Sequence, residues 1–359
     1  MLVMGPLADN YGRRVSILSG WFFITIFGLA SCLSPNIYFL VTTRMLVGAG
    51  IGASQSVAYD LFAESVPTAH RNKIGYVSFF NVFGALYVIL TGFLLLSPHG
   101  WRWMAFACTL PILFIAVVGY FYFPESPRWL TSQGRYEEAE LVLINAAIAN
   151  KCYKGDIVIL PVKSEDQKHY SDLLEGPLMV QTLILWLQWI FASFSHFCVF
   201  LLFVSYFSTG NCSFEFGFLA LGISLQLVGI FSATMIMNYL GRVNTQIMFY
   251  VSASLCMLLY GFIGEYGGSS EIAISMIFLA LICTNSGGAV MWVHTVEMFP
   301  TEVHSMPFIF LFISFLRCSL LYFLFVFFCF LSSGYFSFSF FIYLCIGLLF
   351  VHLHCAEYS

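Results

Sequence analysis

Charged side chains gather near the start of this chain, in a short loop between apolar stretches. The loop runs from Gly5 to Arg14 and holds Asp9, Gly12 and Arg13. A carboxylate in this position can pair with the guanidinium groups or accept hydrogen bonds at a helix N-terminus. Charges so placed would hold or release one conformation of a membrane protein. The alternative is a solvated loop that contributes under about 1 kcal/mol.

The composition requires lipid as part of the solvent, because 60% of the residues are hydrophobic and only 9% are charged. About 20 residues of helix cross the roughly 30 Å hydrocarbon layer, and backbone groups inside lipid must bond within their own segment. We therefore predict an all-α polytopic membrane protein. Ten apolar windows are long enough to span: 15–33, 37–59, 75–96, 103–123, 179–207, 216–237, 243–264, 272–296, 306–331 and 335–353.

Lysine and arginine residues predict the orientation, because cytoplasmic loops near span ends are enriched in positive charge. If the Arg13–Arg14 loop is cytoplasmic, Arg102 is the one loop cation that falls on the other side, while Arg44 and Arg317 lie within spans. The remaining loop cations share the cytoplasmic side: Arg71, Lys73, Arg128, Arg135, Lys151, Lys154, Lys163, Lys168 and Arg242.

A polar stretch from Pro124 to about Pro177 separates two groups of spans. We predict a helical bundle over residues 1–129, a cytoplasmic connection over 130–178 and a second bundle over 179–359. The sequence of the first loop has an echo in Asn238–Arg242, and residues 63–71 have one in residues 296–304. Such echoes are typical of parallel repeats related by an axis along the membrane normal.

Two loops carry local signals. The spacing of Tyr136, Ala139 and Leu143 predicts a short amphipathic helix within residues 132–149, lying along the cytoplasmic face. Asn211 begins an Asn-Cys-Ser glycosylation acceptor pattern in a loop predicted to lie outside.

The cysteines and the end of the chain carry no predicted chemistry. Most of the eleven cysteines lie inside apolar spans without metal-like spacing, so we expect small apolar packing residues, no metal site and no cofactor. Residues 305–359 include 14 Phe, and they are either two helices or a wrongly translated end of a gene. We assign this doubtful segment no function.

Several motifs together resemble the major facilitator superfamily, and most closely its synaptic vesicle two-related proteins and organic cation and anion transporters. These motifs are the first loop, the run Arg44-Met-Leu-Val-Gly-Ala-Gly-Ile-Gly52, the loop from Ala63 to Arg71 and Pro124-Glu-Ser-Pro-Arg-Trp-Leu130. The resemblance implies a fold of twelve helices, of which about ten are present here. The resemblance therefore leads us to expect that this chain lacks the first helix and nearly all of the second, and that its N-terminal bundle is incomplete.

The resemblance also implies a set of gating charges that stabilise one access state at a time. We expect Glu64 to cluster with Arg71, and Glu125 to cluster with Arg128. His304 stands where the family usually has arginine, which weakens the second gating cluster. The whole predicted set is Gly5, Asp9, Gly12, Arg13, Arg14, Arg44, Glu64, Arg71, Glu125, Arg128 and Glu297.

Two charged residues, Arg44 and Asp60, lie within the second predicted span and directly after it. Arg44 would cost about 2.5 to 3.5 kcal/mol in lipid, so we expect it to face the bundle interior, the alternative being a side chain that snorkels outward. The nearby Gly48 and Gly52 are predicted to let helices approach closely. Asp60 stands four residues before Glu64, and it either attracts a cation, carries a proton or lies at the water interface.

Polar residues in the later spans outline a candidate substrate or proton path. They lie in the windows at 179–207 and 272–296, which flank the substrate path in the family, and polar faces in lipid turn toward a cavity or another helix. Each is equally an interhelical packing residue, and His294 could respond to pH. With Asp60, the candidates are Gln181, Gln188, His196, Asn285, Trp292 and His294.

We therefore predict a multi-pass protein of the plasma membrane or a vesicle membrane that moves a small organic solute, of the organic ion class, by alternating access. No covalent catalysis or nucleic acid is implied, and a proton or sodium ion is a possible coupling ion. Nucleotide hydrolysis is disfavoured because no phosphate-binding loop is present, and a channel is disfavoured because no selectivity-filter loop is present. The alternative is a non-transporting membrane protein whose transporter-like body binds ligands or partners.

Overall fold

The computed structural model describes residue 8 and residues 10–66, 68–151, 155, 176–207, 215–265 and 269–298, and these residues form helices joined by short connections. Eight helical stretches are long and apolar enough to cross a membrane: Arg13–Cys32, Ile37–Ser65, Lys73–His99, Trp101–Tyr122, Met179–Tyr206, Phe216–Leu240, Arg242–Gly264 and Ser270–Glu297. They confirm eight of the ten predicted spans. The other two lie outside the described residues, as do Gly5, Asp9 and Asn211.

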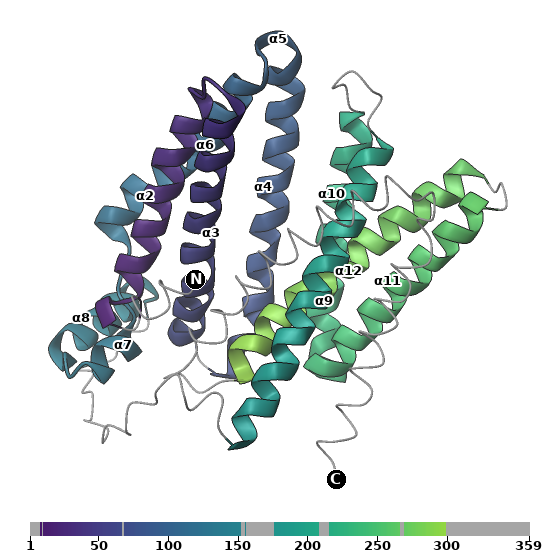
Figure 1. Ribbon diagram of the computed structural model, residues 1–359. Helices are drawn as coiled ribbons and strands as arrows, with labels where there is room; N and C mark the ends of the chain where they lie inside the picture. Colours follow the sequence, from purple (N-terminus) through teal and green to yellow (C-terminus); the bar gives the residue numbers. More distant parts are fainter. Residues whose placement is uncertain are drawn as a thin grey trace. The chain divides into compact units, whose positions relative to one another are not determined.

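The chain divides into two compact units, which are described here separately (Figure 1). Within the described residues, unit 1 takes those up to 71 and those from 94 to 180, and unit 2 takes 72–93 and 181–298. Unit 1 holds α2 (Arg13–Cys32), α3 (Ile37–Ser65), α5 (Ser97–His99), α6 (Trp101–Tyr122), α7 (Pro127–Ser132) and α8 (Tyr136–Ala149). Unit 2 holds α4 (Ser78–Thr91), α10 (Phe216–Leu240), α11 (Arg242–Glu265), α12 (Ser270–Met298) and most of α9 (Gly176–Tyr206). The short helices η1 (Thr68–Val77) and η2 (Gly92–Leu96) span the two boundaries.

In unit 1, α2 and α3 pack closely because two glycines meet where the helices cross. A Cβ atom added to Gly50 would lie 2.8 Å from Ile24 Cγ1 and 3.0 Å from the carbonyl oxygen of Gly20. Gly48, by contrast, has no neighbouring atom within 4 Å of such a Cβ. The prediction that Gly48 supports close approach is wrong, because the buried face of α3 runs through Gly50 and Ser54.

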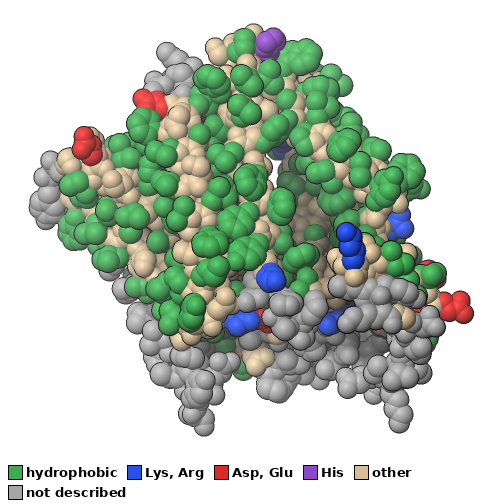
Figure 2. All heavy atoms as spheres, turned by 180° about the vertical axis from the view of Figure 1, so that it is seen from behind, with side chains coloured by type: hydrophobic (Ala, Val, Ile, Leu, Met, Phe, Trp, Pro, Cys, Tyr) green, Lys and Arg blue, Asp and Glu red, His purple; other side chains and the backbone are tan. Residues whose placement is uncertain are grey.

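Helix α6 also packs on α2, and a glycine lies at each of two contacts between them. Gly28 of α2 lies against Thr109, and Gly119 of α6 lies against the Trp21 ring. The opposite side of α6 exposes large apolar side chains, with Phe114 70% exposed. Hydrophobic side chains likewise cover most of the visible surface of the helices (Figure 2), as expected for lipid-facing helices.

The helix predicted within residues 132–149 is confirmed as α8, which the short helix α7 precedes. The Ser126 hydroxyl accepts a hydrogen bond from the Trp129 N–H at 3.3 Å and so caps the start of α7. Ala139 of α8 is fully buried in a small cluster with Trp129 and Leu130. This cluster fixes α8 against α7, which also contacts α3.

In unit 2, α4 packs on α10, and α10 and α11 both pack on α12. The sequence analysis placed α4 with the earlier helices, whereas the structure groups it with the later ones. The reason is a shared apolar core to which every long helix of the unit contributes. Its buried members include Val82, Val199, Phe203, Ile230, Ala253 and Ile277.

The crossing of α2 and α3 gives a direct test of this packing. We expect Gly50→Ala to lower the free energy of unfolding by roughly 1–3 kcal/mol, because the added methyl group has no room. Gly48→Ala is the matched control and should be neutral or stabilising by up to about 1 kcal/mol, since alanine favours helix. Thermal unfolding in detergent measures both. Equal effects for the two variants would contradict the crossing.

Candidate functional site

The start of α2 is capped by a carboxylate from a distant part of the chain. Glu125, which lies between α6 and α7, accepts hydrogen bonds from the backbone N–H groups of Arg13 at 2.9 Å and Arg14 at 3.2 Å. The same carboxylate accepts the N–H of Ser126 at 2.9 Å. The first N–H groups of a helix lack partners within it and carry partial positive charge, so a carboxylate stabilises this end.

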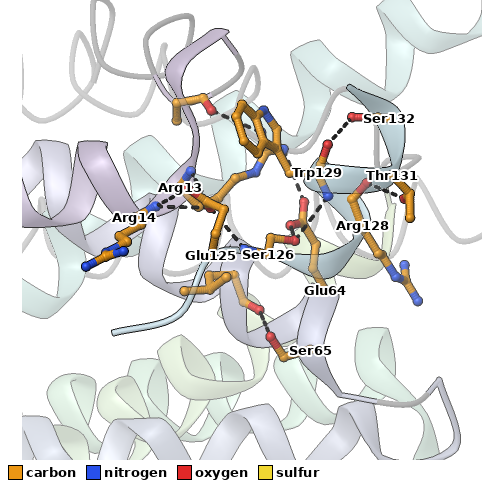
Figure 3. Close-up of polar contacts among 12 residues, drawn as sticks. Arg13, Arg14, Glu64, Ser65, Glu125, Ser126, Arg128, Trp129, Thr131 and Ser132 are labelled. Carbon is orange, nitrogen blue, oxygen red and sulfur yellow. Dashed lines mark hydrogen bonds and ion pairs between the residues drawn. The ribbon is translucent and has the colours of Figure 1, made fainter. Parts of the chain in front are cut away.

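Arg13 and Glu64 form a buried ion pair that joins α2 to the end of α3. The Arg13 Nη2 atom lies 3.1 Å from Glu64 Oε1, and the two side chains are only 7% and 2% exposed. The second oxygen of Glu64 accepts a hydrogen bond from the Ser126 hydroxyl (Figure 3). We call Arg13, Glu64, Glu125 and Ser126 the Arg13 cluster. It ties α2, α3 and the start of α7 together at one point.

Gly12 makes this arrangement possible by its lack of a side chain. Its φ angle is 103°, a backbone conformation that favours glycine, and a Cβ atom there would collide with the Glu125 carboxylate. Glycine is therefore required for both its backbone angle and its empty space.

The partners within this cluster differ from those predicted. Glu64 binds Arg13, and the side chain of Arg71 lies outside the described residues. Glu125 accepts hydrogen bonds from backbone N–H groups, and Figure 3 shows the Arg128 guanidinium pointing away from it in this conformation. A Glu125–Arg128 cluster in another conformation stays a prediction. Arg14 donates instead to the Tyr120 carbonyl at 2.7 Å, near the end of α6. These pairings depend on how helices pack, which the motif alone does not specify.

Unit 2 contains an equivalent pair. Arg242 begins α11 directly after Gly241, whose φ is 78°, and Glu297 stands near the end of α12. The guanidinium donates Nε to one carboxylate oxygen at 2.7 Å and Nη2 to the other at 2.9 Å. We call this the Arg242 pair. The partners are 55 residues apart, compared with 51 for Arg13 and Glu64, so each half of the sequence places a Gly-Arg and a glutamate in the same relation.

Two side chains in these contacts were not among the predicted site residues. Arg242 was visible as an echo of the first loop, and Ser126 lies inside a motif that had been noted, but neither was assigned a partner. Each was found only when the helices were placed together.

Asp60 and Arg44, both on α3, lie in different surroundings. Asp60 is 1% exposed, so its side chain is buried within the protein. Arg44 is exposed and lies off the α3 face that carries Gly50. The packing within unit 1 therefore does not enclose Arg44 as predicted.

Three of the six candidate path residues of unit 2 make contacts between helices. Gln188 of α9 donates Nε2 to Gln246 Oε1 of α11 at 2.5 Å, and Asn285 of α12 donates to Gln226 of α10. The ring of Trp292 meets the Trp189 ring edge to face, with centroids 4.7 Å apart. These contacts give the residues a packing role in this conformation, and contact with a solute stays a prediction.

Three candidates of unit 2 remain, namely His196, Gln181 and His294. His196 stacks on Phe200, with the ring centroids 6.5 Å apart. Gln181 and His294 are partly buried. No group of three or more His, Cys, Asp or Glu side chains that could hold a metal lies among the described residues.

Comparisons with known proteins give the family and the fold of this chain. The family model described as sugar (and other) transporter matches residues 1–357. This chain belongs to that family. The chain is also similar in structure to the proton:xylose symporter XylE of the major facilitator superfamily, bound to 6-bromo-6-deoxy-D-glucose. The TM-score is 0.76 at 23% identity, covering 97% of this chain and 81% of that one. The fold is that of the major facilitator superfamily, and the chain is a multi-pass membrane protein.

Two curated relatives lie in the same range of similarity. The synaptic vesicle 2-related protein of Rattus norvegicus is 27% identical over 327 residues, which cover 84% of this chain and 58% of the relative. The niacin transporter NiaP of Acinetobacter baylyi is 27% identical over 305 residues, covering 84% of this chain and 68% of the relative. The chain thus spans less than two thirds of the length of the first of these relatives.

Gly12 and Gly241, which directly precede Arg13 and Arg242, allow the effect of a steric collision to be distinguished from that of backbone strain. We expect Gly12→Ala to destabilise the protein by about 2–4 kcal/mol, because the variant strains the backbone and displaces the Glu125 cap. Gly241→Ala has similar strain but no atom within 4 Å of the new Cβ, so about 1–2 kcal/mol is expected. Chemical unfolding in detergent compares them. If Gly12→Ala destabilised the protein no more than Gly241→Ala does, the Glu125 cap would not depend on the absence of a side chain at Gly12.

Proposed function

We propose that this transporter moves a small organic solute across a membrane by alternating access. The observation that carries the proposal is the pair of matching helix junctions, the Arg13 cluster and the Arg242 pair, one in each unit. Ion pairs at such junctions stabilise one conformation, and breaking them releases the helices to move. The excess of Lys and Arg predicts that both junctions face the cytoplasm.

The solute is proposed to be a small organic molecule, with organic ions as the favoured class. The names of two similar proteins support a small solute. One relative is a niacin transporter, and one protein of similar fold is a proton:xylose symporter. In unit 2, Gln188, Asn285 and Trp292 are proposed to line its path. They would exchange their present contacts with neighbouring helices for contacts with the solute.

The alternative is a membrane protein that binds ligands or partners without moving them. Its support is the similarity to synaptic vesicle 2-related proteins, whose name states no solute. The same body would then open and close without net solute movement. Net uptake separates the two proposals.

Uptake into proteoliposomes tests transport directly. We expect the purified protein to accumulate at least one radiolabelled solute from a panel of organic cations, organic anions including niacin, and xylose. Liposomes without protein are the control. Binding of a solute without any uptake across the panel would favour the alternative.

Charge exchange at the Arg242 pair tests the gating role. We expect Arg242→Glu to slow initial uptake about three- to tenfold, because it places two like charges together at a junction that is partly exposed to solvent. The double variant with Arg242→Glu and Glu297→Arg should recover part of the rate. Arg135→Glu, at an exposed pair on the surface of α8, is the matched control and should leave uptake unchanged. Failure of the double variant to exceed the single one would contradict gating by this pair.

A further inference from the structure

Two adjacent residues of α9 bind this helix to both helices of the Arg242 pair. Gln188 donates its Nε2 atom to Gln246 Oε1 of α11 at 2.5 Å, and Trp189 donates its Nε1 atom to Thr295 Oγ1 of α12 at 3.0 Å. The four side chains are buried within the protein, each 8% exposed or less. We call these two hydrogen bonds the α9 tie.

The α9 tie reaches α11 and α12 close to the charges that join them. Gln246 stands four residues after Arg242, so both side chains lie on one face of α11, roughly 6 Å apart along the helix axis. Thr295 stands two residues before Glu297, which is roughly 3 Å along α12. The α9 tie and the Arg242 pair therefore hold the same two helix ends.

The α9 tie resists breaking because its donors are buried. A buried donor that loses its acceptor keeps the cost of leaving water without the compensating hydrogen bond. The Thr295 hydroxyl also donates to the Met291 carbonyl of its own helix at 2.8 Å, so the acceptor of the Trp189 bond is itself fixed in place. The tie is therefore released most readily when another acceptor replaces Gln246 at the Gln188 amide.

We propose that a solute releases the α9 tie by taking the Gln188 hydrogen bond from Gln246, and so allows the Arg242 pair to open. The proposal rests on the proposed transport function, in which Gln188 lines the solute path, and it names the contact that links solute binding to the gate. The solute then carries an acceptor oxygen, such as that of a carboxylate or a hydroxyl group, because Gln188 offers an N–H donor. Without solute, the tie favours the closed junction.

Hydrogen–deuterium exchange tests the tie without a solute. In the reconstituted protein, Gln188→Leu and Trp189→Phe should each speed exchange at least about threefold at the start of α11 and the end of α12. Each variant removes one bond of the tie, so the helix ends open more often. Trp189→Phe keeps an aromatic ring beside Trp292. Unchanged exchange in both variants would overturn the proposal.

Two changes on α12 give a matched control and a second way to break the tie. Thr295 and Thr284 are both 1% exposed, and each hydroxyl donates to a carbonyl of its own helix, but Thr295 also accepts the Trp189 hydrogen bond. Thr295→Val should therefore speed exchange at the start of α11, and Thr284→Val should not. Equal exchange there in the two variants would overturn the proposal, including the case in which the α9 variants do not fold.

Opposite effects on the KM for uptake separate competition from a purely structural role. For a solute that is taken up, Gln188→Leu should raise KM at least about threefold, because it removes the solute contact. Gln246→Leu should lower KM by about the same factor, because Gln188 no longer exchanges a bond to bind the solute. Changes of KM in the same direction would overturn the proposal.

The panel of solutes also tests the acceptor chemistry. Uptake of niacin or xylose, which carry carboxylate and hydroxyl oxygens, would support it, whereas uptake restricted to tetraethylammonium, which has no acceptor oxygen, would overturn it. Absence of all uptake would count against the transport function and so against release by a solute. The exchange results would still decide whether the α9 tie holds the Arg242 pair closed.

Discussion

A buried ion pair between Arg13 and Glu64 is the interaction on which the rest of unit 1 depends. Removing two charges from water costs several kcal/mol per ion, and good geometry with further hydrogen bonds offsets that cost. The Ser126 hydroxyl supplies one such bond to Glu64, and Glu125 stabilises the helix end that presents Arg13. Because these groups come from three separate parts of the chain, loosening the pair loosens the junction of all three.

The two units place similar charges in different surroundings. The side chains of the Arg242 pair are 36% and 21% exposed, whereas those of Arg13 and Glu64 are 7% and 2% exposed. Solvent and salt screen the more exposed pair more strongly, so it contributes less to holding a conformation. The Arg13–Glu64 pair is therefore expected to stabilise its helix junction more strongly than the Arg242 pair does. Its glutamate lies on α3, as does Asp60.

The sequence predicts the membrane helices well because bilayer thickness fixes their length, so apolar windows such as 103–123 reappear as α6 (Trp101–Tyr122). It also predicted Glu64 and Glu125 as site residues, and both lie in the Arg13 cluster. It could not choose their partners, because Arg13 and Glu64 are 51 residues apart and meet only through helix packing. For the same reason it chose Gly48 as the packing glycine, although Gly50 lies at the crossing with α2.

A double-mutant cycle on Arg13 and Glu64 tests the central claim most directly. The free energies of unfolding of Arg13→Gln, Glu64→Gln and the double variant give the coupling between the two side chains, and the exposed Arg135–Glu138 pair serves as a second cycle for comparison. We predict a coupling of about 1–3 kcal/mol for the buried pair and under about 1 kcal/mol for the exposed one. Additive effects within about 0.5 kcal/mol at Arg13 and Glu64 would contradict the account.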